Sequence, residues 1–408
     1  MPPESPGVSS ARPAFSSLPV LTLPSPRCSR EAEAAFAAEL REVCHTVGFF
    51  YVAGIDDVVS PATRENALAA SARFFAMPQA KKDAIDNRNS AAFRGYVRLG
   101  AENTAGLPDL REQVEFGVET NAPAMEKESG TPPYACLRGP NQWPDERDCP
   151  RFRADATRFA DEARALSTRL TRLLALSLDL PEDAFAPVFG DAPNVQMKIA
   201  RYPSVAVTKS SDERDERDEK KSAGKENAPS DAEEDARAFG VGAHTDSGFL
   251  SLLLQDRTGG LQVMNGAGEW VDAPPVKNTL VVNLGEMLQL ATRGYYLATP
   301  HRVLPPTAAS ARLSVPYFWN PRLEYVCEPL DLPPSVRWTR AGAPTAAFAS
   351  AANRSEEESK QKNVLLEAYG ANALKSLARS HPEVMARHHP DLTVGEDGTV
   401  EWRTSGRA

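Results

Sequence analysis

The stretch Gly-Ala-His-Thr-Asp at residues 242–246 places an imidazole and a carboxylate two residues apart. The apolar run 249–254 follows at once, and this pattern is typical of β-strand structure. Residues i and i+2 of a strand point to the same face of a sheet. We therefore expect His244 and Asp246 to project together from one face, where a further side chain can complete a site.

A second strand-like run, residues 295–303, carries the third candidate, His301. Two imidazoles and one carboxylate on facing strands form a facial triad with three open positions, the arrangement that suits non-haem Fe(II). An isolated His-x-Asp pair is more often structural, so the third side chain and the residues that follow it decide between the two interpretations. We predict that His244, Asp246 and His301 are metal ligands on which catalysis depends.

A basic side chain and a hydroxyl follow in the same spacing, as Arg312-x-Ser314. On a strand they share a face. A guanidinium binds a carboxylate through two parallel hydrogen bonds, and a nearby hydroxyl can add a third. A buried Arg more often pairs with a structural acid, but no Asp or Glu stands between Glu286 and Glu324. This favours the carboxylate of a ligand as the partner, while an acid from a distant part of the chain stays an alternative.

Taken in order, His244-x-Asp246, His301 and Arg312-x-Ser314 resemble the 2-oxoglutarate/Fe(II)-dependent oxygenases of the isopenicillin N synthase-like family. The resemblance covers roughly residues 17–340, apart from a long charged insertion. Three other segments are similar to parts of that family, namely residues 18–23, 48–52 and 197–203. The last of these departs from some relatives, which have Asn where this chain has Ala200.

The resemblance implies an all-β core with flanking helices, built as a double-stranded β-helix (jelly roll). It implies a dioxygenase that uses Fe(II), O2 and 2-oxoglutarate as co-substrate, with ascorbate as an optional stimulant. Such an enzyme oxidises a small molecule, by hydroxylation or desaturation, and releases succinate and CO2. The implied site residues are His244, Asp246 and His301 for iron, and Arg312, Ser314 and Tyr202 for 2-oxoglutarate.

Candidate substrate contacts come from two places. Residues 90–118 read as a long, Gly-rich, mostly polar connection, and loops of this length are often functional. In similar enzymes this region covers the substrate side of the site, which makes Arg94 and Tyr96 candidates, although a structural role is the simpler interpretation of each. Phe318 shares the Arg312 face by strand parity, so it could stack on substrate or serve as ordinary core.

Two other functions stay open. Isopenicillin N synthase and aminocyclopropane-carboxylate oxidase carry the same Arg-x-Ser pair for a substrate carboxylate, so an Fe(II) oxidase of this fold that uses no 2-oxoglutarate is one alternative. Succinate formed in step with substrate oxidation separates the two. A non-catalytic binding protein is the other alternative, but a scaffold has no reason to keep all three metal ligands.

Composition bounds the class of protein. With 408 residues and 41% apolar content, one large β-domain with helical additions is allowed. The formal charge of −9 gives no footprint for nucleic acid, and no apolar run is long enough for a membrane span. The five cysteines lack zinc-like spacing, which favours a reducing, cytoplasmic location.

The N-terminal segment bears on the same question. Residues 1–16 are rich in Ser and poor in acid, as import signals are, but they are short and weakly basic. The oligomeric state stays open.

The predicted organisation has four parts. Residues 1–16 are expected to be disordered, residues 17–180 to form a helical and strand region packed on the core, and residues 181–340 to form the core itself. Within the core, residues 209–237 carry only polar and small side chains, with eleven acids and seven bases, and are expected to be a disordered insertion. Residues 341–408 should hold a second insertion, a helix at 364–380 and a polar tail.

The local patterns predict further elements. Helices are expected at residues 29–46, where Ser29 can cap the first turn and Gly48 can end the helix, at 60–78 and at 150–178. A hairpin is expected around residues 265–268 and a buried strand at 279–284. The tail contains three histidines that we do not expect to bind metal, namely His381, His388 and His389.

Overall fold

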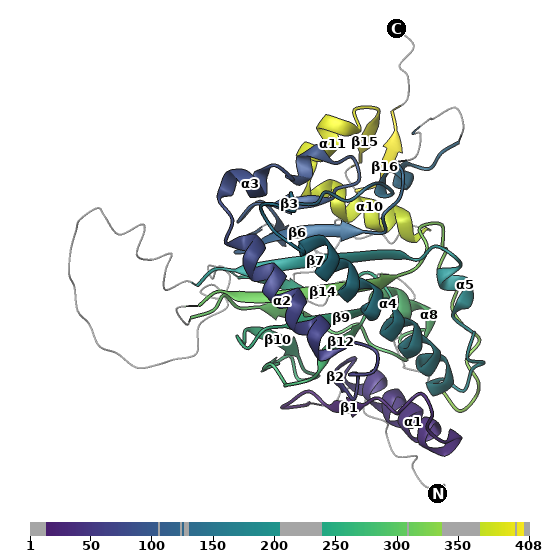
Figure 1. Ribbon diagram of the computed structural model, residues 1–408. Helices are drawn as coiled ribbons and strands as arrows, with labels where there is room; N and C mark the ends of the chain where they lie inside the picture. The colour runs from purple at the N-terminus through teal and green to yellow at the C-terminus, as the bar shows by residue number, and fades with distance from the viewer. Residues whose placement is uncertain are drawn as a thin grey trace, which may run out of the picture.

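Two packed β-sheets form the centre of the molecule (Figure 1). The computed structural model describes residues 14–104, 107–122, 125, 130–204, 239–307, 310–336, 368–395 and 398–403. Within them the larger sheet has eight strands in the order β1-β2-β12-β9-β14-β7-β6-β3, and the smaller has four in the order β11-β10-β13-β8. All neighbours are antiparallel except β1 and β2. The double-stranded β-helix predicted from the sequence is confirmed.

The strand bounds follow sheet by sheet. The larger sheet consists of β1 (Val20–Thr22), β2 (Phe49–Ala53), β3 (Gly95–Val97), β6 (Glu112–Gly117), β7 (Asn194–Tyr202), β9 (Leu250–Gln255), β12 (Leu280–Leu284) and β14 (Arg312–Asn320). The smaller consists of β8 (Val241–His244), β10 (Leu261–Met264), β11 (Trp270–Asp272) and β13 (His301–Val303). Two short hairpins, β4 (Asn103–Thr104) with β5 (Leu107–Pro108) and β15 (Leu392–Val394) with β16 (Val400–Trp402), form separate two-stranded sheets.

Three long helices cover the outer face of the larger sheet: α1 (Arg30–Thr46), α2 (Pro61–Phe75) and α4 (Phe152–Ser177). The first two start as their sequences predict, because the Ser29 hydroxyl accepts the Ala32 amide hydrogen at 3.2 Å and the Ser60 hydroxyl accepts that of Thr63 at 3.1 Å. The apolar stripe of α4 packs into the main core, as expected. None of the helices in the described residues is long and apolar enough to cross a membrane.

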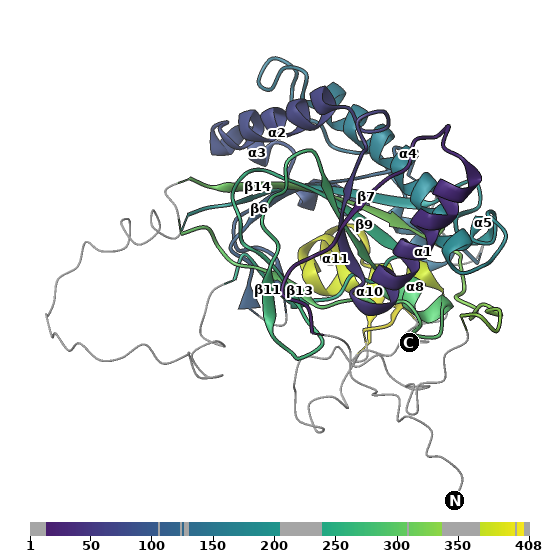
Figure 2. The same cartoon turned by 90° about the horizontal axis from the view of Figure 1, so that it is seen from below.

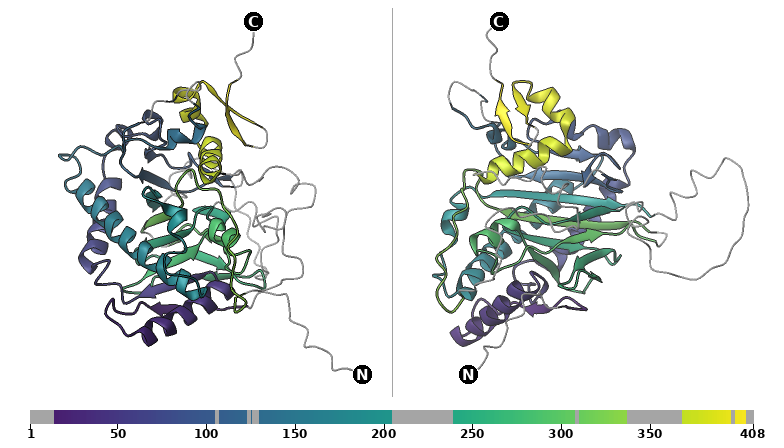
Figure 3. Two further views of the ribbon diagram at one scale, coloured as in Figure 1. Left: turned by 90° about the vertical axis from the view of Figure 1, so that its right-hand side faces the viewer. Right: turned by 180° about the vertical axis from the view of Figure 1, so that it is seen from behind.

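The remaining helices are shorter. They are α3 (Gln79–Asp83), α5 (Ala186–Phe189), α8 (Glu286–Ala291), α10 (Tyr369–Ser380) and α11 (Pro382–His388), with 3-10 turns η1 (Asn87–Asn89) and η2 (Pro133–Leu137). Seen from below, α2 and α4 lie on one side of the larger sheet while α10 and α11 lie on the other, near the smaller sheet (Figure 2). Both views of Figure 3 place α10 and α11 at the end of the molecule opposite α1.

The structure corrects three sequence-based predictions. Residues 90–118 are not one long connection, because β3 and β6 lie within them and extend the larger sheet. The strand expected at 295–303 is confined to His301–Val303. The polar tail is instead a packed segment in which His381 and His389 are each 6% exposed. The helix predicted at 364–380 is present as Tyr369–Ser380, and the predicted hairpin and buried strand are also present.

Several predicted segments lie outside the residues that the structure describes, and one predicted boundary is left untested. The charged insertion 209–237, residues 341–362 and most of residues 1–16 lie outside the described residues. The division at residue 180 stays a prediction, although strands from both sides of it, such as β2 and β12, share one sheet.

Candidate metal and co-substrate site

The three predicted metal ligands converge at the open edge of the smaller sheet. His244 ends β8 and His301 begins β13, and the two residues are direct cross-strand partners with ring centroids 4.3 Å apart. Asp246 lies beyond the end of β8, so the turn rather than strand parity brings it to the same place. Its Oδ1 is 3.8 Å from His244 Nε2 and 3.9 Å from His301 Nε2. Coordinating atoms of all three lie within 4.8 Å of one another.

Hydrogen bonds behind the triad aim these atoms. His244 Nδ1 is 2.8 Å from the Gly242 carbonyl, and His301 Nδ1 is 3.1 Å from the Thr299 carbonyl. Because a carbonyl only accepts, each Nδ1 carries the hydrogen and each Nε2 presents a lone pair to the centre of the triad. This donor set is the one that a divalent iron ion takes in a facial triad.

The carboxylate is held from behind as well. Asp246 Oδ2 accepts hydrogen bonds from Ser251 Oγ at 2.6 Å and Asn283 Nδ2 at 2.8 Å. These two contacts use one carboxylate oxygen and leave Oδ1 facing the imidazoles. Ser251 on β9 and Asn283 on β12 are cross-strand partners, so the larger sheet orients a ligand that belongs to the turn after β8.

The protonation states suit a cation. Burial, followed by the charge of His301, lowers the pKa of His244 to about 4. Burial raises the pKa of the Asp246 carboxyl, but the two imidazoles and its hydrogen bonds outweigh that effect and hold the pKa below its usual value. At neutral pH the site therefore offers one negative oxygen and a neutral His244, which fits Fe(II).

Replacing Asn283 by alanine should weaken iron binding without removing a ligand. The variant loses the 2.8 Å hydrogen bond that orients Asp246, and loss of such a partner costs about 10- to 100-fold in metal affinity or activity. Anaerobic Fe(II) titration measures the change. Asn265→Ala is the matched control, because Asn265 is also 5% exposed but lies in the hairpin after β10. Equal losses in the two variants would rule out a specific role for Asn283.

A buried guanidinium lies on the inner face of the larger sheet. Arg312 begins β14, is 0% exposed and stacks 4.9 Å over the ring of Tyr202, its cross-strand partner. Its Nη2 donates to Gln255 Oε1 at 3.2 Å, while Nε and Nη1 have no hydrogen-bond partner in the described residues. A buried charge without a carboxylate partner is costly, so these two groups fit an organic acid such as 2-oxoglutarate.

Two hydroxyls complete the predicted clamp. Ser314 lies two residues after Arg312 on the same face and is 1% exposed. Burial raises the pKa of Tyr202, but the charges of Arg312 and Arg111 and a hydrogen bond with Ser314 outweigh it and lower the pKa below its usual value. Arg312, Ser314 and Tyr202 are thus brought together as the sequence predicts. Their assignment to 2-oxoglutarate stays a prediction.

Arg111 is a further residue of this region that the sequence motifs do not reveal. It immediately precedes β6 and forms a hydrogen bond with Tyr202, and its Nη2 lies 2.6 Å from Glu102 Oε2. A signal is present in the sequence, because Arg111, Gln113 and Glu115 alternate with the apolar residues 114 and 116. Alternation of this kind is typical of a strand with one polar face.

The three candidate substrate contacts fall in different places. The prediction for Tyr96 is wrong, because this residue packs in the core on the helix-covered face of the sheet and its hydroxyl lies 2.6 Å from Glu112 Oε2. Phe318 pairs with Ser251, which places its ring on the sheet face from which Ser251 bonds the Asp246 carboxylate. Arg94 is buried, its Nη2 donates to the Leu137 carbonyl at 3.0 Å, and its Nε has no partner in the described residues.

The fold and the site together define a class of protein, a non-haem Fe(II) oxygenase on a double-stranded β-helix. Comparison with known families agrees. Residues 18–146 match the family described as non-haem dioxygenase in morphine synthesis N-terminal, and residues 224–321 match the 2OG-Fe(II) oxygenase superfamily. The chain belongs to the 2-oxoglutarate/Fe(II)-dependent oxygenases.

Similar proteins span most of the chain. The 2-oxoglutarate-dependent dioxygenase frbJ of Dothideomycetidae sp. is 32% identical over 93% of this chain and 95% of its own length. A 2-oxoglutarate-dependent dioxygenase of Gibberella zeae is 32% identical over 93% of this chain and 92% of its own length. A Neurospora crassa protein solved in complex with alpha-KG and thymine is 25% identical, with a TM-score of 0.61 over 81% of this chain and 95% of that one.

These relatives establish the enzyme class. The chain is a 2-oxoglutarate-dependent dioxygenase, an oxidoreductase that uses Fe(II) and 2-oxoglutarate. Bound iron supplies oxidising power from O2 and 2-oxoglutarate, with release of succinate and CO2. The residues described above orient the metal ligands and offer an anchor for an organic acid. An oxidase that does without 2-oxoglutarate is not favoured.

Proposed function

We propose that this dioxygenase hydroxylates or desaturates a small organic molecule that binds over the inner face of the larger sheet, beside the triad. The observation that carries the proposal is the position of Phe318 and Arg312 on one face of β14. The Phe318 ring lies beside Ser251, which bonds Asp246, and the Arg312 guanidinium lies six residues away along the strand. Substrate at the first position and 2-oxoglutarate at the second would both reach the iron.

We also propose a substrate contact, a subgroup and a location for this enzyme. Arg94 would contact polar groups of the substrate, because its guanidinium is buried and its Nε lacks a partner in the described residues. Placement in the isopenicillin N synthase-like group and a cytoplasmic location rest on the sequence motifs and cysteine usage alone. The Neurospora crassa protein has been crystallised with thymine, which supports a small-molecule substrate for this chain.

The test is a mass-spectrometric screen of small metabolites with Fe(II), ascorbate and 2-oxoglutarate. We expect one class of compound to gain an oxygen atom or lose two hydrogen atoms, with one succinate formed for each product molecule. Product formed without 2-oxoglutarate or succinate would instead indicate the Fe(II) oxidase. Phe318→Ala should reduce product formation while leaving 2-oxoglutarate binding unchanged, and equal loss of both would remove Phe318 from the substrate side.

A further inference from the structure

A second buried group of polar side chains lies on the inner face of the larger sheet. We call it the polar cluster, and it consists of Glu102, Gln113, Glu115, Lys198 and His381. All of them except Lys198 are at most 9% exposed. None of these residues belongs to the His244, Asp246 and His301 triad or to the predicted clamp of Arg312, Ser314 and Tyr202.

The register places the polar cluster beside the co-substrate anchor. Gln113 pairs with Ala200, and Ala200 in turn pairs with Ser314, so the three lie side by side across β6, β7 and β14. Arg111 connects the two regions, because it binds Glu102 on one side and Tyr202 on the other. A molecule bound at the cluster would therefore lie next to bound 2-oxoglutarate.

The cluster is not suited to a second metal ion. Glu102, Glu115 and His381 have coordinating atoms within 4.8 Å of one another, which is the spacing of a metal site. Lys198 Nζ, however, lies 3.2 Å from Glu102 Oε1 and 2.8 Å from Glu115 Oε1. An ammonium group already neutralises these carboxylates, and Arg111 adds a second positive charge beside Glu102.

One free hydrogen-bond acceptor remains in the cluster. Gln113 Nε2 donates to Glu102 Oε2 at 2.7 Å and to Glu115 Oε1 at 2.6 Å. Because ionised carboxylates only accept, these two bonds fix which end of the amide is nitrogen. Gln113 Oε1 then points elsewhere, is buried, and has no partner in the described part of the chain.

One free donor accompanies it. Asn87 Nδ2 lies 3.2 Å from His381 Nδ1, and an amide nitrogen donates, so Nδ1 accepts and the ring hydrogen lies on Nε2. His381 Nε2 is also buried without a partner in the described residues. Each unsatisfied buried group costs folding stability that a matching ligand would recover on binding.

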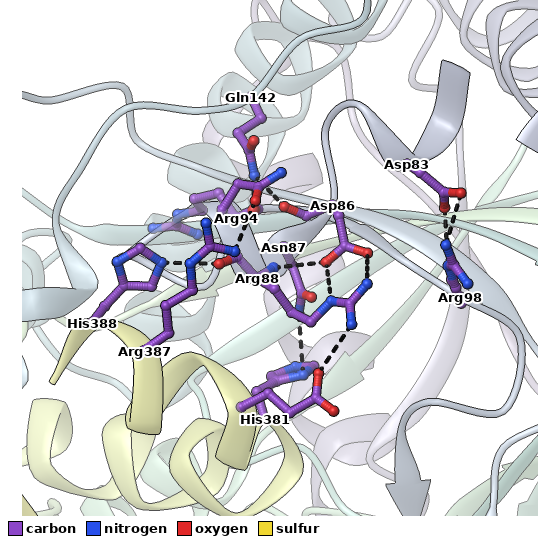
Figure 4. A network of polar contacts seen from close by, with 12 residues as sticks. Asp83, Asp86, Asn87, Arg88, Arg94, Arg98, Gln142, His381, Arg387 and His388 are labelled. Carbon is purple, nitrogen blue, oxygen red and sulfur yellow. Dashed lines mark hydrogen bonds and ion pairs between the residues drawn. The ribbon is translucent and has the colours of Figure 1, made fainter. Parts of the chain in front are cut away.

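The C-terminal segment holds this imidazole in place (Figure 4). Arg387 Nη1 donates to Asn89 Oδ1 at 3.0 Å, and His388 Nε2 lies 2.9 Å from the Arg88 carbonyl. His389 Nε2 lies 2.8 Å from another carbonyl, that of Ala91. These contacts tie α11 to the turn around η1, so that the histidine at the start of α11 reaches the polar cluster.

We propose that Gln113 and His381 determine substrate specificity by binding the polar edge of an uncharged molecule that has an N–H next to a C=O, as in a lactam or another amide. The N–H would donate to Gln113 Oε1 and the carbonyl would accept from His381 Nε2. An uncharged ligand is favoured because Lys198 and Arg111 already pair with Glu102 and Glu115, and Arg111 also lies 3.1 Å from Asp109 Oδ2, so neither cation is left for an anionic ligand. This inference rests on the proposed substrate position beside the triad.

The test uses ligand-observed NMR on the full-length protein loaded with Zn(II) and saturated with 2-oxoglutarate, so that no turnover occurs. The probes are 2-piperidone, which is a neutral lactam, piperidine, which is a cation, and valerate, which is an anion. We expect saturation transfer to 2-piperidone alone. Binding by only a charged probe, or by none of the three, would overturn the proposal.

Variants locate the binding. His381→Phe keeps a ring against Phe93 but removes the donor, and it should weaken 2-piperidone binding at least about tenfold, the value of one hydrogen bond. Gln113→Met should do the same. His389→Phe is the matched control, since His389 is equally buried and stacks on Phe93 but has its Nε2 already bonded. Equal binding in native protein and His381→Phe would overturn the assignment.

A second measurement, the affinity for 2-oxoglutarate, separates a loss of lactam binding from a general loss of the site. Calorimetric titration with 2-oxoglutarate should give the same affinity in native protein, His381→Phe and His389→Phe, because none of these changes touches Arg312. Loss of lactam binding with unchanged 2-oxoglutarate binding supports the specificity role. Failure of 2-oxoglutarate to bind the native protein would count against the enzyme assignment itself, and so is distinguishable.

Discussion

Replacing His301 by alanine is expected to reduce turnover at least about 1,000-fold, which corresponds to about 4 kcal/mol in the activation free energy. The side chain contributes one of three metal-binding atoms, and Asp246 Oδ1 and His244 Nε2 alone would hold iron poorly. The variant also leaves the Asp246 carboxylate without one of the imidazoles that lower its pKa. Product formation at saturating Fe(II) and 2-oxoglutarate measures the effect.

Loss of folding must be separated from loss of iron. His389→Ala provides the comparison, because His389 is 6% exposed against 7% for His301 and lies in the C-terminal segment. Both variants should unfold at lower temperature than native protein, but only His301→Ala should lose stoichiometric Fe(II) binding. Native-like turnover in His301→Ala would refute the metal site.

Replacing Arg312 by lysine should raise the 2-oxoglutarate concentration needed for half-maximal rate by about 10- to 100-fold, since hydrogen bonds to charged groups are worth about 1.5–3 kcal/mol. Lysine keeps the charge but cannot form the two parallel bonds of a guanidinium. Arg312 Nε and Nη1 lack partners in the described residues, and either of them can form such a pair together with the second hydrogen of Nη2. Initial rates over a range of 2-oxoglutarate concentrations give the result.

Two comparisons make this outcome specific. Fe(II) affinity should stay native in Arg312→Lys, because the guanidinium does not hold the triad. Arg64→Lys serves as the matched control. Arg64 lies in α2, is 6% exposed and donates a hydrogen bond to Asp56 Oδ1. An unchanged half-saturating concentration in Arg312→Lys would place the carboxylate anchor elsewhere on the sheet.

The site was predictable where a short motif carries the chemistry. His244, Asp246 and His301 converge as expected, but strand parity does not place Asp246, since β8 ends at His244. Asp246 reaches the site because Ser251 and Asn283 bond its other oxygen. Contacts of this kind join distant segments and leave no local pattern in the sequence.

The strand β6 was hidden by its charges. Glu112 and Glu115 project from opposite faces of it, so the alternation of residues 113–116 does not extend to residue 112. Both acids are buried because distant cations meet them: Lys82 bonds Glu112 at 2.7 Å, and Lys198 bonds Glu115 at 2.8 Å. Propensity alone could not reveal partners that only the folded sheet supplies.

The C-terminal histidines were misjudged for a related reason. A polar composition suggested a solvated tail, but Phe93 packs against both His381 and His389, and Val384 and Met385 between them are buried. Two apolar residues in one helical turn are too weak a signal to predict docking. The contact depends on η1, almost three hundred residues earlier in the chain.

The most direct test is a crystal structure of the protein grown anaerobically with Fe(II) and 2-oxoglutarate, with anomalous data collected at the iron edge. We predict one iron peak in contact with His244 Nε2, Asp246 Oδ1 and His301 Nε2, and 2-oxoglutarate with its distal carboxylate on the Arg312 guanidinium. An iron peak among Glu102, Glu115 and His381, or iron bound without His301, would contradict the account.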